Sequence, residues 1–359
     1  MYCNKIKYRN FRNIADEEIE FENGVNILCG NNAEGKTNSL EGIYLFANGR
    51  SFRKCTDRDM ISFDSDFSSL KLDFTDRVRQ QEMELKLQRG QRKTCRRNSV
   101  PIKKMSDFLG YFRAVLFCPE HLSIIKDGPS ERRSFLDSAI SQIKPYYAAA
   151  LAKYSNILDQ RNDLLKNYEE KKDEFDKTIA LWSGFLAKEA ELISRERLDY
   201  VKKLDQHIAD FFNDMTSGNE KVAADYPYIK SEEDFYRDLT QNLEKEIASG
   251  TTLYGPHKDD IDITLNGRDS RLYCSQGQQR CLSLALKMAE GEISKEVTGE
   301  YPVFLFDDVF SELDSKRKNY VINGIKDRQV IITSCEKDEL EKNAQCVFEV
   351  SKGKYTRIK

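Results

Sequence analysis

The chain has 359 residues, of which 39% are hydrophobic and 33% charged, so it is long enough for two or three domains with a sizeable core. No stretch approaches the ~20 consecutive apolar residues that span a bilayer, and the first residues are charged where a signal peptide is apolar, so we expect a cytoplasmic protein without a membrane anchor. The nine cysteines include no C-x-x-C pair, which disfavours a zinc site, and the net charge of −3 excludes no partner, because one face of the protein can still be basic.

Two strands are expected at the start of the chain, around residues 5–8 and 19–21. The segment NFRNI between them carries Arg12. Two interpretations of Arg12 are open: a solvated loop cation, or a contact with a nucleotide phosphate or base, suggested by its closeness in sequence to the strand that follows.

Residues 25–46, VNILCGNNAEGKTNSLEGIYLF, predict a nucleotide site. A short buried strand is expected over 25–29, and an amphipathic helix from Lys36 onward. Between them lies the G-x-x-x-x-G-K-[ST] phosphate loop in its strand–loop–helix context. Its backbone amides and the helix N-terminus favour phosphate, Lys36 is expected to hold the β- and γ-phosphates, and Thr37 to ligate Mg²⁺. The residues expected to bind ATP here are Gly30, Asn31, Asn32, Ala33, Glu34, Gly35, Lys36 and Thr37.

A basic hairpin is expected after this helix. Segments 68–75 and 82–89 alternate apolar and polar residues, which predicts antiparallel strands with one exposed face. Residues 86–104 contain no acid, and many of them are basic. Such a run is either a solvated edge that discourages strand pairing or a surface for nucleic-acid phosphates, and both interpretations are open. The candidate DNA-binding residues are Arg92, Lys93, Arg96 and Arg97.

The middle of the chain is predicted to be helical. A strand over 113–118 precedes a helix in GPSERRSFLD, for which Ser130 is the expected N-cap. Apolar residues at 3–4 spacing then predict two long helices joined around residues 169–174, the second about 60 Å long. A helical lobe that packs its own apolar stripe is favoured over a coiled coil that binds a partner.

The last third of the chain returns to an α/β pattern. A short strand is expected over 262–265 with a turn at Asn266-Gly267, and SQGQQR opens a helix over 281–296. An apolar strand then runs into Asp307 and Asp308, which is the Walker B pattern. One carboxylate there is expected to hold Mg²⁺ and the next to take a proton from the attacking water. Another strand is expected over 329–334.

Three motifs in order, GNNAEGKT, SQGQQR and FLFDDVFSELD, resemble the Walker A, signature and Walker B plus D-loop motifs of the ABC-type ATPases of the SMC group. Within that group, GRSFR, FCPEHL, GPSERRSFLD and YGPHKDDI are similar to the RecF family of recombination mediators, over about residues 8–334. The resemblance implies an α/β, ABC/SMC-head ATPase fold with an inserted α-helical lobe. The expected divisions are an N-terminal ATPase half at 1–112, the helical lobe at 113–250 and a C-terminal ATPase half at 251–359.

The resemblance also implies a head-to-tail homodimer with ATP between the subunits. Ser275 and Gly277 of one subunit, with Gln278 beside them, would contact the γ-phosphate held by the other subunit. Asp314 would act across the same interface.

Roles within one subunit are implied as well. Asp307 would serve Mg²⁺, and Asp308 would be the hydrolytic carboxylate, with Lys36 as its catalytic partner. Glu120 takes the place of the Q-loop glutamine and is a further candidate metal ligand. Ser334 takes the place of the switch histidine, so we expect slow turnover.

Two functions are open. In the first, ATP closes the dimer on double-stranded DNA or on a junction of single- and double-stranded DNA at a gap. Weak, DNA-stimulated hydrolysis then reopens it, while RecR-like and RecO-like mediators help to load recombinase in repair and replication. In the second, hydrolysis is the output of an ATPase subunit of another SMC-like complex. The basic hairpin favours the first, because phosphate contacts stabilise a DNA complex.

Overall fold

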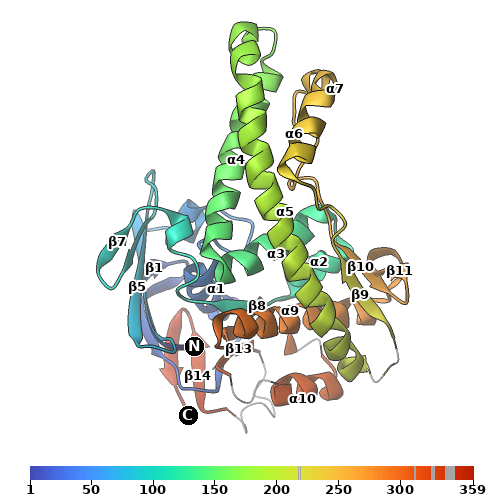
Figure 1. The fold of residues 1–359 in the computed structure, drawn as a ribbon. Helices are drawn as coiled ribbons and strands as arrows, with labels where there is room; N and C mark the ends of the chain where they lie inside the picture. Colours follow the sequence, from blue (N-terminus) through green and yellow to red (C-terminus); the bar gives the residue numbers. More distant parts are fainter. Residues whose placement is uncertain (217, 219, 311–312, 325–327, 336–343) are drawn as a thin grey trace. The chain divides into compact units, whose positions relative to one another are not determined.

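The computed structural model describes the chain except residues 217, 219, 311–312, 325–327 and 336–343 (Figure 1). The chain divides into two compact units. The first consists of Met1–Leu122, Asp210–Asn219 and Arg280–Lys359, and the second of Ser123–Ala209 and Glu220–Gln279. Across the described residues, no helix is both long enough and apolar enough to cross a bilayer.

A six-stranded sheet of order β15-β14-β3-β13-β12-β8 forms one layer of the first unit. The five strands from β14 to β8 are parallel, and β15 is antiparallel at the edge. Because the carboxyl ends of parallel strands meet at one edge, the loops that follow β3, β8, β12 and β13 lie together there. The strands are β3 (Val25–Cys29), β8 (Ala114–Phe117), β12 (Val303–Asp307), β13 (Val330–Ser334), β14 (Cys346–Ser351) and β15 (Lys354–Arg357).

An antiparallel sheet of order β2-β1-β4-β5-β6-β7 forms a second layer of this unit. Along β4 and β5 every second residue is buried, which confirms the alternation expected from the sequence. The strands are β1 (Tyr2–Phe11), β2 (Ile14–Glu20), β4 (Phe67–Thr75), β5 (Gln80–Gln88), β6 (Thr94–Arg97) and β7 (Val100–Ile102).

Helix α1 (Lys36–Asn48) packs against strands of both sheets. It contacts β1 and β4 of the antiparallel sheet and β8, β12 and β13 of the parallel sheet. The helix is therefore buried on nearly all sides, and the expected amphipathic pattern with a solvent-facing side is wrong. A close approach explains Gly42, where a Cβ would lie 2.4 Å from the ring of Tyr8.

Shorter elements and two helices complete the first unit. This unit has three short 3₁₀ turns, the last of which, η3, begins two residues after the carboxyl end of β8. The elements are η1 (Asp57–Met60), η2 (Met105–Asp107), η3 (Pro119–Leu122), α10 (Ser315–Gly324) and most of α9 (Gln276–Thr298).

The second unit contains the expected helical hairpin. Helix α4 (Pro145–Lys166) is followed by α5 (Lys172–Thr216), whose 45 residues span about 67 Å and which belongs to this unit as far as Ala209. Near the turn, Leu164, Leu165, Phe175 and Ile179 form a buried cluster, so the hairpin packs its own apolar stripe there. The other elements are α2 (Ser123–Lys126), α3 (Pro129–Ile143), β9 (Val222–Asp225), α6 (Glu232–Gln241), α7 (Leu243–Ser249), β10 (Asp262–Leu265), β11 (Arg268–Asp269) and α8 (Ser270–Tyr273).

Two expectations about boundaries differ from the structure. Strand β8 pairs with β12, so the first unit extends beyond residue 112, and β10 pairs with β9, so the second unit extends beyond residue 250. The expected N-cap at Ser130 is wrong, because α3 begins at Pro129 with Gly128 as its N-cap. Proline suits the first helical position, where its missing N–H is not needed.

Candidate ATPase site

The phosphate loop connects the carboxyl end of β3 to the first residue of α1. Gly30 lies so close to β14 that a Cβ there would be 2.3 Å from the carbonyl oxygen of Val350. Gly35, the N-cap of α1, has a φ of 115°, which residues with a side chain rarely adopt. The backbone path thus requires both glycines of the motif, and it brings the loop to a helix N-terminus that favours anions.

The amine of Lys36 turns back over this loop. Its Nζ donates to the carbonyl oxygens of Gly30 at 2.5 Å and Asn31 at 2.8 Å. It also donates to the Cys335 sulfur at 3.4 Å. These acceptors are neutral, so they do not cancel the charge of the ammonium. Lys36 is only 6% exposed, so this charge is buried and faces the loop. This arrangement suits the binding of phosphate groups.

Two hydroxyl groups hold the first Walker B carboxylate. Thr37 and Thr333 each donate from Oγ1 to Asp307 Oδ1 at 2.8 Å. Thr333 lies opposite Asp307 in the parallel register of β12 and β13, which explains the second bond. Burial raises the pKa of Asp307 above its ordinary value, while the two hydroxyl hydrogen bonds lower it. A positively charged neighbour, such as a metal ion, would therefore stabilise this buried carboxylate.

Glu120 is the second carboxylate whose charge acts on this site. It is an exposed residue of η3, and its charge is close enough to raise the pKa of Asp307. Across the described residues no group of three or more His, Cys, Asp or Glu side chains is arranged to hold a metal. Mg²⁺ in nucleotide sites needs only one or two protein carboxylates, because phosphates and water complete its shell. The oxygens of Thr37, Asp307 and Glu120 therefore fit Mg²⁺.

Asp308 has an unusual backbone conformation. Its φ is 52°, in the left-handed region that residues other than glycine seldom occupy. Its N–H donates to Thr333 Oγ1 at 2.9 Å, so β13 fixes both Walker B residues. Strained backbone that the surrounding structure enforces is concentrated at functional sites. The conformation supports a chemical role for Asp308.

Arg12 forms an ion pair with a helix residue that the sequence reasoning missed. Its Nε and Nη2 donate to the two carboxylate oxygens of Glu41 at 2.9 and 2.6 Å, and Glu41 is fully buried in α1. The interpretation of Arg12 as a solvated loop cation is therefore wrong. A nucleotide contact of Arg12 stays a prediction. Glu41 is a single acid in the apolar stretch SLEGIYLF, which was the available signal for a buried charge.

The signature residues Ser275, Gly277 and Gln278 belong to the second unit, whereas the phosphate loop belongs to the first unit. Ser275 Oγ accepts from the Gln278 N–H at 3.3 Å, and Gln278 Oε1 accepts from the Ser275 N–H at 2.8 Å. This reciprocal pair is a capping box at the start of α9. Gly277 lies in the exposed first turn, where a Cβ would meet open space. The local structure of the signature is thus an exposed helix N-terminus.

The D-loop residue Asp314 lies just before α10. Its Oδ1 accepts from the Arg317 N–H at 2.9 Å, and its Oδ2 pairs with the Arg317 guanidinium at 3.0 Å. The side chain is exposed. Ser311 and Glu312 of the same motif lie outside the described residues.

The basic hairpin is formed by β5, β6 and β7, and its four candidate cations differ in their surroundings. Lys93 is bound internally, with Nζ 2.6 Å from the Gly49 carbonyl oxygen and 3.0 Å from Asp57. Arg97 stacks on the ring of Tyr111, with its Cζ 3.7 Å from the centroid.

Arg92 and Arg96 are the exposed members of this set. Neither guanidinium forms an ion pair or a hydrogen bond with any residue that the structure describes. They are therefore the better candidates for phosphate contacts.

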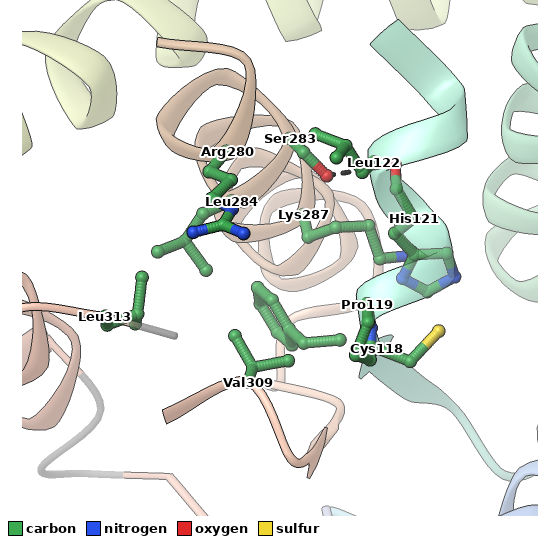
Figure 2. Close-up of a pocket in the computed structure, with 11 residues that line it drawn as sticks. Cys118, Pro119, His121, Leu122, Arg280, Ser283, Leu284, Lys287, Val309 and Leu313 are labelled. Atoms are coloured by element: carbon green, nitrogen blue, oxygen red, sulfur yellow. Dashed lines mark hydrogen bonds between the residues drawn. The ribbon is translucent and has the colours of Figure 1, made fainter. Parts of the chain in front are cut away.

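A small pocket of about 50 Å³ lies between η3, one face of α9 and the segment after β12 (Figure 2). Figure 2 shows Ser283 donating to the carbonyl oxygen of His121, which joins α9 to η3 at 3.0 Å. Burial lowers the pKa of His121, and the positive charge of Lys287 lowers it further. Val309 and Leu313 form the opposite wall, next in sequence to Asp308 and Asp314. The pocket thus borders the Walker B and D-loop segments.

Comparison with known proteins agrees with this geometry. The family model of the RecF/RecN/SMC N-terminal domain matches residues 2–357. The DNA replication and repair protein RecF of Clostridium kluyveri is 38% identical over 367 residues, covering 100% of both chains. A solved structure of the recombination mediator protein RecF with ATP in the RecFOR pathway aligns with a TM-score of 0.93 and 34% identity, over 100% of this chain and 98% of that one.

A more distant solved structure shows the fold alone. The SMC head bound to the C-terminal winged-helix domain of ScpA aligns over 100% of this chain and 97% of that one, with a TM-score of 0.58 and 16% identity. The fold is therefore that of the ABC/SMC-head ATPases. From its match to the family model and its full-length identity with curated relatives, the chain belongs to the RecF family of DNA replication and repair proteins.

Proposed function

We propose that the protein is an ATP-dependent DNA clamp in recombinational repair and replication. ATP closes a homodimer on DNA, and slow hydrolysis opens it again. The observation that carries the proposal is the convergence of Lys36, Thr37 and Asp307 at one edge of the parallel sheet, where Thr37 Oγ1 lies 2.8 Å from Asp307 Oδ1. The ATP-bound structure of a relative with 34% identity supports ATP as the ligand.

The phosphate loop would bind the triphosphate. The ammonium of Lys36 would leave its carbonyl acceptors for the β- and γ-phosphates, and the loop residues 30–35 would surround them. Thr37, Asp307 and Glu120 would hold Mg²⁺, which supplies positive charge that neutralises the phosphates when bound. The contact proposed for Arg12 requires that it reach the nucleotide while it is paired with Glu41.

Hydrolysis would depend on Asp308. Its carboxylate takes a proton from the attacking water, and β13 holds its backbone through the hydroxyl group of Thr333. We propose that the activity is weak and stimulated by DNA, because Glu120 and Ser334 replace the glutamine and histidine expected at the Q-loop and the switch.

The dimer would place a second anion site on the nucleotide. Ser275, Gly277 and Gln278 lie at the exposed N-terminus of α9, whose partial positive charge favours a γ-phosphate from the partner subunit. ADP lacks that group, so only ATP would join both subunits. Asp314, exposed before α10, would act across the same interface.

The DNA would be double-stranded or a junction of single and double strands. Arg92 and Arg96 supply exposed charge for its phosphates, with Lys93 and Arg97 supporting the hairpin from within. The RecFOR pathway named for the solved relative supports RecR-like and RecO-like mediators as partners, in the cytoplasm.

The test is the mass of the full chain in solution, measured by light scattering without nucleotide, with ADP and with ATP. The Asp308→Asn variant is measured beside the wild type, because it should retain ATP. Lys36→Met is the control that should not bind ATP. Each dimer fraction is then mixed with duplex DNA.

We expect Asp308→Asn to be dimeric with ATP alone and to bind DNA in that state, while Lys36→Met stays monomeric. If the mass in solution is the same without nucleotide, with ADP and with ATP, the clamp proposal is wrong. The roles proposed for Ser275 and Asp314 then fail as well. ATP-dependent dimers that do not bind DNA would instead favour an ATPase subunit of another complex.

A further inference from the structure

The residue after β13 links the phosphate loop to the second Walker B carboxylate. The thiol of Cys335 donates to Asn32 Oδ1 at 2.8 Å, and its sulfur lies 4.0 Å from Asp308 Oδ1. The same sulfur accepts from Lys36 Nζ at 3.4 Å. Cys335 therefore contacts the phosphate loop at Asn32, the amine of Lys36 that is proposed to bind phosphate, and the carboxylate of Asp308 that is proposed to act in hydrolysis.

The position of Cys335 at the end of a strand explains why it reaches the site. β13 ends at Ser334, and Cys335 is the next residue, at the same edge of the parallel sheet as the phosphate loop and Asp308. Thr333 bonds both Walker B residues, and Cys335 extends that contact to the side chain of Asp308. The backbone carbonyl of Ser334 accepts from the Gly30 N–H at 3.3 Å.

The thiol has a single proton, so it can make only one full hydrogen bond as a donor. In this structure the proton is directed to the nearer acceptor, Asn32. A γ-phosphate in the loop would attract the Lys36 ammonium away from the Cys335 sulfur. A carboxylate is the stronger acceptor of the two, because it is charged. Filling the loop therefore favours transfer of the thiol hydrogen bond from Asn32 to Asp308.

We propose that Cys335, rather than Ser334, is the switch residue of this ATPase. It bonds Asn32 when the loop holds no γ-phosphate, and it bonds Asp308 when the γ-phosphate is bound. The second bond orients the Asp308 carboxylate for the attacking water, so Cys335 is a positioning residue. This inference rests on the proposed role of Asp308 in hydrolysis.

The test compares single-turnover ATP hydrolysis by the full-length chain and its variants, with the dissociation constant of ATP measured separately. Cys335→Ala removes the donor, Cys335→Ser keeps a donor of similar size, and Ser334→Ala tests the neighbouring position. Cys335 is exposed, so none of its variants is expected to unfold the protein, and the melting temperature checks this.

We expect Cys335→Ala to slow hydrolysis roughly three- to tenfold, the effect of one weak hydrogen bond, with less than a twofold change in ATP affinity. Cys335→Ser should restore the rate to within twofold of the wild type. The inference is overturned if Cys335→Ala hydrolyses ATP at the wild-type rate, or if only Ser334→Ala is slow.

Asp308→Asn separates this inference from the proposed function. If Asp308→Asn stops hydrolysis and Cys335→Ala does not slow it, only the role of Cys335 fails. If Asp308→Asn hydrolyses ATP at the wild-type rate, the proposed role of Asp308 fails, and the role of Cys335 fails with it.

Discussion

Arg161 and Glu246 form an ion pair inside the second unit, with Arg161 Nη2 2.6 Å from Glu246 Oε2 and both side chains 0% exposed. The guanidinium also donates to the hydroxyls of Ser183 at 3.1 Å and Thr252 at 2.8 Å. One charged network thus joins α4, α5 and α7 with the segment after α7. A buried pair of this kind fixes the packing of the helices, because every other arrangement leaves a charge without a partner.

Breaking this pair from one side is expected to be costly. Arg161→Met leaves the Glu246 carboxylate buried without its cation, so we expect the free energy of unfolding to fall by about 3–5 kcal/mol. The double variant Arg161→Met/Glu246→Leu should recover most of this loss. Urea denaturation followed by circular dichroism measures both. Lys171→Met, which breaks an exposed pair with Asp163, is the matched control and should cost at most about 1 kcal/mol. Equal losses in Arg161→Met and the control would contradict the prediction.

Arg12 and Glu41 allow a structural role to be separated from a nucleotide contact. Arg12→Met removes the two hydrogen bonds of Arg12 to the fully buried Glu41 carboxylate and leaves Arg53, at 3.5 Å, as its remaining cation, so we expect the free energy of unfolding to fall by about 2 kcal/mol. Glu41→Gln disturbs the same pair but keeps the Arg12 cation. A rise in the ATP dissociation constant in Arg12→Met alone would establish the nucleotide contact. Equal ATP affinity in both variants and the wild type would restrict Arg12 to a structural role. Calorimetry with ATP and thermal unfolding supply the two readouts.

Local signals made much of the site predictable from the sequence. The phosphate loop depends on Gly30 and Gly35, whose spacing reflects backbone geometry within one turn. Walker B was recognisable because an apolar strand ends in Asp307 and Asp308. The S-x-x-Q pattern of Ser275 and Gln278, in contrast, also encodes a capping box that the sequence reasoning left unused.

Tertiary contacts account for what could not be predicted. The helix α1 was expected to have a solvent-facing side, but it is buried by packing against β1 and β4 of one sheet and β8, β12 and β13 of the other. None of these strands is the element directly before or after it in the sequence. Lys93 looked like its basic neighbours, yet Gly49 and Asp57, far away in the sequence, bind it internally. The roles of Glu41 and Cys335 likewise depend on partners that no local pattern reveals.

Two residues of the loop at 254–261 (YGPHKDDI), His257 and Asp259, predict that stability depends on pH. The Nε2 of His257 donates to the Thr252 carbonyl oxygen at 3.0 Å, and its Nδ1 lies 2.6 Å from the Tyr154 hydroxyl, which can donate to the neutral ring. Burial lowers the pKa of His257 to about 4. The unfolded chain therefore binds the proton more readily, so this contribution to stability is complete above pH 6.5 and is lost as the pH falls toward 4.

Asp259 in the same loop acts in the opposite direction. Burial raises its pKa to about 6, and its carboxylate accepts from the Tyr226 hydroxyl. The folded protein binds this proton more readily, so acidification from pH 6 toward 4 strengthens folding through Asp259. Urea midpoints between pH 7.5 and 4.5 separate the two groups. On acidification, we expect His257→Gln to lose less stability than the wild type and Asp259→Asn to lose more. Parallel curves for all three proteins would refute both assignments.

The hairpin predicts which cations contact DNA. Arg92 and Arg96 are exposed, so Arg92→Glu/Arg96→Glu should weaken DNA binding by the ATP-bound dimer. The slope of log affinity against log salt should also fall by about one for each phosphate contact that is lost.

Lys93→Met is the internal control for this prediction. The Lys93 amine already bonds Gly49 and Asp57, so its loss should lower the melting temperature while the salt slope stays near the wild-type value. Fluorescence anisotropy of labelled duplex DNA, in the Asp308→Asn background with ATP to prevent turnover, gives affinity and slope from one titration series. If Lys93→Met reduced the slope as much as the Arg92→Glu/Arg96→Glu pair, exposure would not decide which cations reach the phosphates. The hairpin would then have to rearrange on binding DNA, because Lys93 could reach a phosphate only by leaving its two internal partners.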